Sequence, residues 1–242
     1  MTTSTDHSLP LLNSVLDCVG SDIVSGAIVP GSTFTLQSLS ERFNVSRTVA
    51  REAMRALEQL GLVSSSRRVG ITVLPMQEWS VFDHAIISWR LSNEKTRQEQ
   101  VSSLNQLRLS IEPMAARLAA TSAPVEERRE ILALARKLHE LENTPSPRTG
   151  EELAADLRFH TMVLHASGNE MFAALAPSLL SLLKGKSVFG SAKRDPLGGT
   201  AELHLDLARA ICDSRPDEAE TLAREILDTA RTNTTKELGA PN

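Results

Sequence analysis

The stretch NVSRTVAREAMRALEQLGLV, Asn44 to Val63, decides the fold of the N-terminal part of this chain. It spaces Arg47, Arg51 and Arg55 one helical turn apart, beside a row of alanine, methionine and leucine residues. Ser46 is a favourable N-cap for a helix that begins at the next residue. The stretch therefore predicts an amphipathic helix whose basic face points away from the core.

The sequences on either side predict the elements that accompany this helix. A shorter helix is expected over about residues 36–43, and Asn44-Val45-Ser46 forms a tight turn between the two helices. LVSSS and GITVL, on the C-terminal side, read as two short strands joined by a turn that contains Arg67 and Arg68. Two helices joined by a tight turn and followed by a hairpin are typical of a winged helix-turn-helix.

The basic face has two interpretations. In a helix-turn-helix the N-terminal end of the second helix enters the major groove of DNA, and Arg47, Thr48 and Arg51 point outward at that end. Arginine can pair with guanine or grip phosphate, and Arg67 and Arg68 at the wing tip could reach the adjacent backbone or minor groove. The alternative is a solvated helix face whose arginines pair with nearby glutamates.

Composition favours a helical protein with an uneven charge distribution. The 242 residues fit one large domain or two modest ones, and tyrosine is absent while leucine and alanine are abundant. The net charge is −4. Residues 31–75 hold six basic and three acidic residues, a net +3, so the remainder carries −7. This asymmetry is typical of a nucleic-acid-binding module joined to an acidic partner domain.

Targeting and redox features are sparse. The first twenty residues lack a basic segment followed by a long apolar run, and no later segment has the roughly 18 apolar residues of a membrane span. Cys18 and Cys212 show no CxxC spacing, so we expect reduced thiols. We therefore expect a cytoplasmic protein that does not contact membranes.

Residues 28–73, IVPGSTFTLQSLSERFNVSRTVAREAMRALEQLGLVSSSRRVGITV, resemble the winged helix-turn-helix of the GntR family of bacterial transcription regulators. The PG turn, the VSR tripeptide and the REA that follows carry the resemblance, with alanine where the family usually has valine. The resemblance implies that Arg47 and Arg51 contact DNA, with Ser46 and Thr48 beside them. Gln37 stands where some members place a DNA-contacting arginine, and RRVG replaces the family's frequent glycine pair. Both departures concern the operator sequence that is read.

The C-terminal part contains residue types that suit a divalent metal. Asp156 and His160 are four positions apart on one helix face, and His204 lies on a later helix that could cross nearby. A carboxylate and two imidazoles suit zinc or a similar ion, and the interior of a helix bundle often holds such sites. The alternative for the Asp and His pair alone is a surface contact or a helix cap.

Arg108 is a cation on a largely apolar helix, so it needs an anionic partner if it is buried. Glu112, four residues on, is one candidate partner, and a bound ligand is the other. Pro113 removes a backbone hydrogen bond and is expected to kink this helix.

Three further stretches, residues 107–120, 156–172 and 202–211, resemble the FCD effector domain of the FadR-like branch of the same family. The resemblance implies that Arg108 receives the carboxylate of an effector. It places four further residues around that effector: Asp156, His160, His204 and Asn169. In metal-binding members a third histidine comes from the last helix, where this chain has Ile226, and His165 is the obvious nearby substitute. Either three protein ligands hold a divalent metal, or the polar residues bind the effector directly.

These features predict a mostly α fold, with a winged helix-turn-helix bearing a small two-stranded wing and a C-terminal all-α bundle. We expect a DNA-binding domain over residues 1–75 and a linker with a bridging helix, about 81–91, over 76–98. An effector-binding and dimerisation domain follows over 99–235, and a tail over 236–242.

The favoured function is a homodimeric transcriptional repressor, not an enzyme, that binds a palindromic operator and responds to a small carboxylate. DHAIISWRL, residues 83–91, resembles a segment of members that sense sugar acids, which indicates a gluconate-like ligand. A hydroxy acid, a dicarboxylate or a fatty acyl ligand stays open. A metal-dependent hydrolase would need a general base that no HExxH-like motif supplies, and a helical protein-binding adaptor would not need the winged helix-turn-helix.

Overall fold

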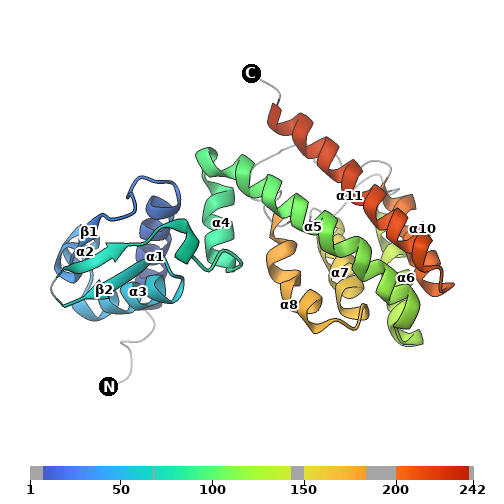
Figure 1. Cartoon of the computed structure of the whole chain (residues 1–242), viewed down its shortest axis with the longest axis horizontal. Coiled ribbons are helices and arrows are strands. Elements are labelled where there is room, and N and C mark those ends of the chain that lie inside the picture. The colour runs from blue at the N-terminus through green and yellow to red at the C-terminus, as the bar shows by residue number, and fades with distance from the viewer. Residues whose placement is uncertain (1–7, 68, 143–149, 184–199, 240–242) are drawn as a thin grey trace. The chain divides into compact units, whose positions relative to one another are not determined.

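The computed structural model describes residues 8–67, 69–142, 150–183 and 200–239 (Figure 1). The chain divides into two compact units, Met1–Gln100 and Val101–Asn242. Helices dominate both units, and a small antiparallel sheet lies in the first. The predicted fold class, a winged helix-turn-helix followed by a helical bundle, is therefore confirmed.

Local capping fixes the first helix of the helix-turn-helix, α2 (Leu36–Phe43). The Thr35 side chain accepts the backbone N–H of Ser38 at 3.0 Å, and the Ser38 hydroxyl accepts the backbone N–H of Thr35 at 3.0 Å, which together form a capping box. Asn44 ends the helix in the left-handed conformation, with φ of 49°. The chain therefore leaves α2 in the tight turn that the sequence predicts.

The second helix, α3 (Arg47–Gln59), begins where the Ser46 side chain accepts the backbone N–H of Val49 at 3.2 Å. Its apolar face packs against α1 (Ser8–Val24) and α2. The fully buried residues of α3 are Ala50, Ala53 and Leu57. Met54, which the sequence assigns to the same core, is partly buried against it.

The wing contains one more strand than the sequence predicts. β2 (Val63–Ser66) and β3 (Gly70–Val73) form the expected antiparallel hairpin, with Val63 opposite Val73 and Ser66 opposite Gly70. A third strand, β1 (Thr33–Phe34), pairs with β3, so the order is β1-β3-β2. The wing is thereby anchored to the segment that leads into α2.

A short connecting region completes the first unit. The 3-10 turn η1 (Met76–Glu78) precedes α4 (His84–Ser92), which starts slightly later than predicted because Asp83 caps it by accepting the backbone N–H of Ala85 at 2.8 Å. In α4, Trp89 donates from Nε1 to Asp17 Oδ1 of α1 at 3.0 Å. This contact holds α4 against α1.

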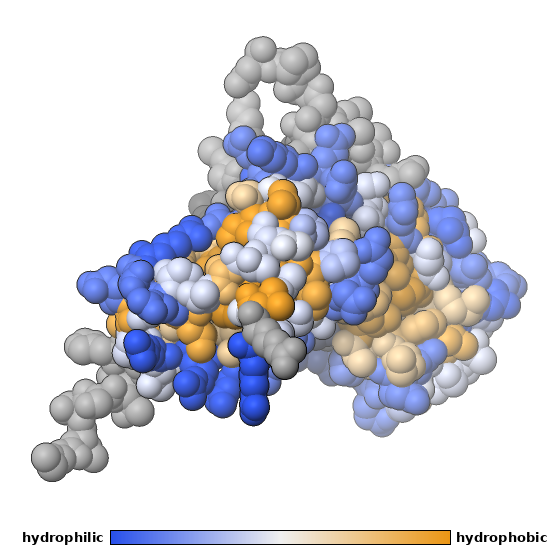
Figure 2. All heavy atoms as spheres, turned by 60° about the vertical axis from the view of Figure 1, so that its left-hand side comes forward, coloured by the Kyte–Doolittle hydropathy of each residue, from blue (hydrophilic) through white to orange (hydrophobic). Residues whose placement is uncertain are grey.

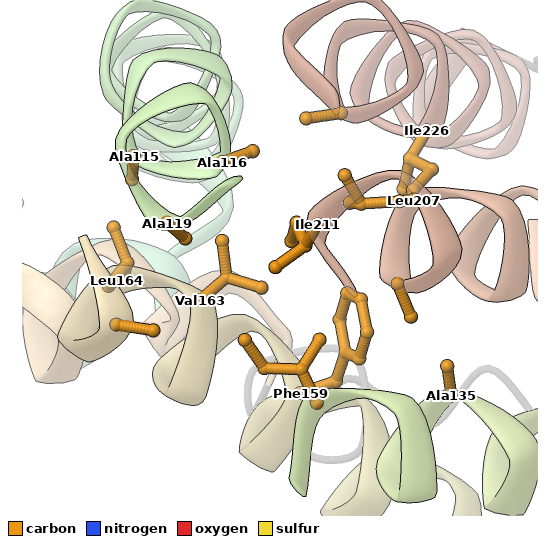
Figure 3. Packing of buried hydrophobic residues seen from close by; sticks show 14 of the residues in the cluster. Ala115, Ala116, Ala119, Ala135, Phe159, Val163, Leu164, Leu207, Ile211 and Ile226 are labelled. Carbon is orange, nitrogen blue, oxygen red and sulfur yellow. The ribbon is translucent and has the colours of Figure 1, made fainter. Parts of the chain in front are cut away.

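The second unit is a helical bundle. Its helices are α5 (Glu94–Ser122, which starts in the first unit), α6 (Val125–Glu142), α7 (Glu151–Ala166), α8 (Glu170–Leu179), α10 (Thr200–Cys212) and α11 (Pro216–Gly239). α10 packs against both α6 and α11, and α7 packs against α6 and α8. α5 continues as a helix through Pro113. Figure 3 shows Ala115, Ala116 and Ala119 of α5 on the side toward Leu164 and Val163 of α7 and Ile211 of α10, so small α5 side chains line this part of the core.

The visible face of the protein in Figure 2 carries both hydrophilic residues and areas of apolar residues. None of the described helices is both long and apolar enough to cross a membrane. Cys18 and Cys212 carry free thiols.

Candidate functional site

The predicted DNA-contacting residues lie on one end of the helix-turn-helix and on the wing. Arg47, Thr48 and Arg51 are exposed in the first turns of α3. Arg55, one turn further on, forms an ion pair with Glu52 at 2.9 Å, so part of its charge is already neutralised. The N-terminal end of α3 presents two arginines, Arg47 and Arg51, for which no ion pair within the described residues is found.

The other predicted DNA contacts differ in their surroundings. Gln37 is exposed on α2 and donates from Nε2 to Glu41 Oε1 at 2.9 Å. Ser46 is engaged as the N-cap of α3, so its side chain supports the helix end. Arg67 is exposed between β2 and β3, whereas Arg68 lies outside the described residues. DNA contact by each of these residues stays a prediction.

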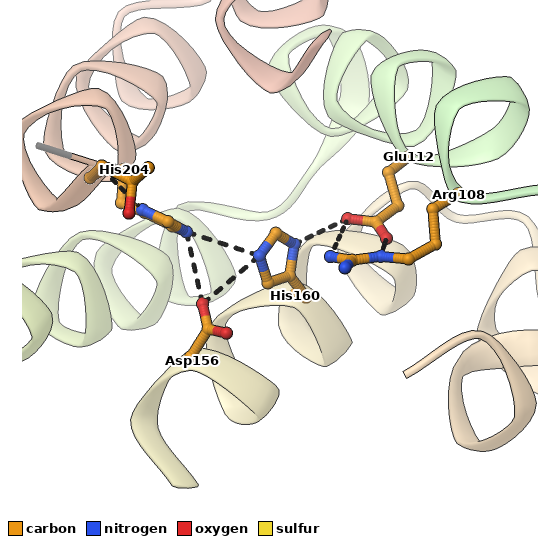
Figure 4. Close-up of polar contacts among 6 residues, drawn as sticks. Arg108, Glu112, Asp156, His160 and His204 are labelled. Carbon is orange, nitrogen blue, oxygen red and sulfur yellow. Dashed lines mark hydrogen bonds and ion pairs between the residues drawn. The ribbon is translucent and has the colours of Figure 1, made fainter. Parts of the chain in front are cut away.

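The second unit contains a chain of buried polar side chains that runs across three helices (Figure 4). α5 contributes Arg108 and Glu112, α7 contributes Asp156 and His160, and α10 contributes His204. Each of the five is at most 9% exposed. Burial of so many charged groups in a bundle core costs free energy unless they satisfy one another, and here their contacts are continuous.

Glu112 is the hub on the α5 side. Arg108 donates from Nε to Glu112 Oε1 at 2.5 Å and from Nη2 to Oε2 at 3.4 Å. His160 donates from Nδ1 to Oε2 of the same carboxylate at 2.6 Å. Burial alone would raise the pKa of Glu112, but the charges of Arg108 and His160 and their hydrogen bonds lower it to about 2.

The other end of the chain is a triangle of potential ligand atoms. Asp156 Oδ1 lies 3.4 Å from Nε2 of both His160 and His204, and these two nitrogen atoms are 3.4 Å apart. His204 donates from Nδ1 to the carbonyl oxygen of Thr200 at 2.7 Å, which turns its Nε2 toward the other two atoms. Phe159 packs edge-on against both imidazoles. The three potential ligand atoms therefore face one another beside the apolar ring of Phe159.

Charges and hydrogen bonds shift the pKa values of His160 and Asp156 in this triangle. Burial alone would lower the pKa of His160, but the charge of Glu112 and hydrogen bonds to Asp156 and Glu112 raise it to about 9. Burial acts in the opposite direction on Asp156, and hydrogen bonds and charges from the two histidines hold its pKa well below the usual range. The described network therefore balances two carboxylates against Arg108 and a protonated His160.

The donor set and its spacing fit a divalent metal. Zinc bound at about 2.0–2.1 Å in tetrahedral geometry has ligand atoms about 3.3–3.4 Å apart. The 3.4 Å edges between Asp156, His160 and His204 match one face of such a tetrahedron. Among the described residues these three are the group that could hold a metal ion. A metal would have to displace the Nε2 proton of His160, as metal binding to histidine generally does.

The remaining predicted ligands do not join this group in the described contacts. Ile226 is 2% exposed and lies in the apolar core, so the position of a third histidine is filled by packing. His165 is exposed. Asn169 caps α8 by accepting the backbone N–H of Met171 at 3.0 Å, and its effector role stays a prediction. Glu112 is the member of the network that the sequence reading did not assign to the site; its spacing of four from Arg108 was the available signal.

A winged helix-turn-helix joined to a helical bundle with a buried polar site defines the class of DNA-binding regulators that respond to a small molecule. Comparison with known families and proteins identifies the family. Residues 12–73 match the model for bacterial regulatory proteins of the gntR family, and residues 103–229 match the FCD domain. The chain therefore belongs to the GntR family and is an FCD-containing, DNA-binding transcriptional regulator, not an enzyme.

Curated relatives agree with this assignment, and a solved structure shares the fold. The chain is 32% identical over 206 residues to the HTH-type transcriptional regulator LutR of Bacillus subtilis. The aligned region covers 82% of this chain and 89% of LutR. It is 28% identical over 189 residues to the HTH-type transcriptional regulator YieP of Escherichia coli, covering 78% and 76% of the two chains. The GntR protein of Streptococcus agalactiae superposes with a TM-score of 0.51 at 21% identity, covering 92% of this chain and 99% of that one. The hydrolase and adaptor alternatives are thereby excluded.

Proposed function

We propose that this regulator is a homodimeric repressor with a palindromic operator, and that a small carboxylate, most simply a sugar acid such as gluconate, binds the second unit and weakens operator binding. Residues 1–75 serve as the DNA-binding domain, and residues 99–235 bind the effector and form the dimer. A dimer places two recognition helices on half-sites about 34 Å apart, which suits a palindrome.

The observation that carries the ligand part of the proposal is the 3.4 Å triangle of Asp156, His160 and His204. A divalent ion held there supplies positive charge and a coordination position that a ligand oxygen can occupy, because three protein donors leave a tetrahedral site open. The apolar Ile226 at the position of a further histidine supports an open position.

Charge supports an anionic effector. In the metal-free network the two carboxylates are balanced by Arg108 and protonated His160, so the group is neutral. Replacing one proton by a divalent ion adds a net single positive charge to a buried site, which favours an anion. Arg108 uses two of its five N–H groups on Glu112, so other N–H groups of this guanidinium can receive an effector carboxylate.

The DNA part of the proposal is tested by replacing Arg47 and Arg51 together with alanine. We expect operator affinity to fall at least about 30-fold, since each of the two lost contacts is worth about 1–3 kcal/mol. Arg55→Ala is the matched control, because this arginine lies on the same helix but is paired with Glu52; its loss should be no more than a few-fold. Fluorescence anisotropy on an operator selected from random DNA measures both. Unchanged binding by the double variant would exclude groove contact by α3.

The effector part is tested by metal analysis and thermal shift on purified protein. We expect about one zinc or similar ion per chain, and its loss in His160→Ala and His204→Ala variants. Gluconate or galactonate should raise the melting temperature of the metal-loaded protein, because a ligand that binds only the folded state stabilises it. Citrate, lactate and a fatty acyl carboxylate serve as comparison ligands. If no sugar acid shifts the melting temperature and another carboxylate does, the gluconate assignment is wrong.

A further inference from the structure

Glu112 lies outside the metal-ligand triangle, yet its carboxylate contacts one of the three ligands directly. Its Oε2 atom is 2.6 Å from Nδ1 of His160, and its side chain is 4% exposed. Glu112 is on α5, whereas all three ligand residues are on α7 and α10. This hydrogen bond is therefore the described polar link between α5 and the triangle.

The two histidines of the triangle are oriented in the same way by different acceptors. The Thr200 carbonyl oxygen can only accept, so Nδ1 of His204 carries the hydrogen and Nε2 faces the site. The Glu112 carboxylate plays the equivalent part for His160, because an ionised carboxylate also only accepts. In both rings Nδ1 is held from outside and Nε2 is left for the ligand position, as is usual for metal-binding histidines.

Arg108 supports this arrangement from the other side of Glu112. Its Nε contacts Oε1 at 2.5 Å and its Nη2 contacts Oε2 at 3.4 Å, while His160 contacts Oε2 at 2.6 Å, so both oxygens of the carboxylate are held. These hydrogen bonds from charged donors fix the plane of the carboxylate.

We propose that Glu112 is a positioning residue of the metal site, which holds His160 with Nδ1 protonated and Nε2 directed at the metal, and that Arg108 acts through Glu112. The inference rests on the proposed metal site. With Glu112 included, the metal site draws on three helices, α5, α7 and α10, instead of two. Metal binding at the triangle would therefore act on α5 through Glu112.

The test compares metal affinity in the full-length wild type, in Glu112→Gln and in Glu220→Gln. Glu220 also accepts from an α5 arginine, Arg117 Nη1 at 3.2 Å, but lies on α11 and contacts none of the three ligands in the described structure, so it is the matched control. Cobalt(II) is titrated against a chromophoric chelator, and its visible spectrum reports the coordination geometry. We expect Glu112→Gln to lose 10- to 100-fold in affinity, the usual effect of removing a partner of a metal-bound histidine, with an altered spectrum, and Glu220→Gln to stay within two-fold.

A second variant separates positioning from folding. Replacing both Arg108 and Glu112 by methionine removes the buried charges together, which proteins often tolerate without loss of stability; it should show the same loss of cobalt affinity while it stays folded. Wild-type affinity in Glu112→Gln, or in the double variant if Glu112→Gln does not fold, overturns the inference. If the wild type itself binds no cobalt, the proposed metal site fails as well. The wild-type titration therefore distinguishes failure of the metal site from failure of the Glu112 inference alone.

Discussion

Gly61 shows how a single residue can fix the end of the recognition helix. Its N–H donates to Glu58 O at 3.0 Å, and the next N–H, of Leu62, donates to Leu57 O at 3.0 Å. These two bonds form a Schellman motif, which requires the left-handed φ of 72° found at Gly61. A Cβ atom there would lie 2.0 Å from the carbonyl oxygen of Glu78, so the chain also needs glycine for space.

We predict that Gly61→Ala lowers the free energy of unfolding by about 2–4 kcal/mol, from left-handed strain together with overpacking against backbone. Gly26→Ala is the control, because Gly26 has nearly the same φ, 74°, and no atom within 4 Å of the added Cβ. It should cost only about 1 kcal/mol. Urea unfolding followed by circular dichroism measures both. Equal losses would mean that the approach of Glu78 is relieved by a small backbone shift.

At the residue scale, the sequence could name most of the buried site but not its connections. Asp156, His160 and His204 were recognisable as donor types at suitable spacing. The role of Glu112 cannot be recognised from the sequence, because a glutamate four residues from an arginine is far more common on a solvated helix face. Only the packing of α5 against α7 turns that pair into a buried contact with His160.

At the element scale, predictability follows how local each stabilising interaction is. α2, the turn and α3 were predicted closely because their ends are set by side chains within three residues, such as Ser46 accepting from Val49. β1 was missed because two residues carry no alternation, and its partner Ile71 is far along the chain. α5 begins at Glu94, earlier than expected, since polar residues in its first turns hide the helical pattern.

At the scale of the whole molecule, the chain connects the two units through α4 and α5. α5 begins in the first unit and continues into the second without interruption. Side chains of its first turns cap the end of α4: the Thr96 hydroxyl donates to Arg90 O at 2.9 Å, and Arg97 donates from Nε to Leu91 O at 2.9 Å and from Nη2 to Ser92 O at 3.2 Å. These bonds hold the first turns of α5 to the end of α4 within the first unit, and together they form the α4–α5 joint.

Because α5 continues from the first unit into the second, we expect that removing the bonds of the α4–α5 joint reduces the coupling between effector binding and operator binding. Coupling between two sites is a free energy, commonly worth a 5- to 150-fold change in affinity. We predict that Thr96→Val with Arg97→Ala lowers the ratio of the operator Kd with effector to that without it by about 3- to 30-fold, the range of coupling changes seen for residues that lie between two sites.

Metal content and operator affinity without effector should stay near wild type, because neither residue belongs to the proposed metal site or to the proposed DNA contacts. Lys95→Ala is the control, since Lys95 is exposed and contributes only its backbone N–H to Asn93 Oδ1 in the described contacts. Anisotropy titrations with and without the effector measure the ratio, and an unchanged ratio in the double variant would mean that the coupling does not pass through the α4–α5 joint.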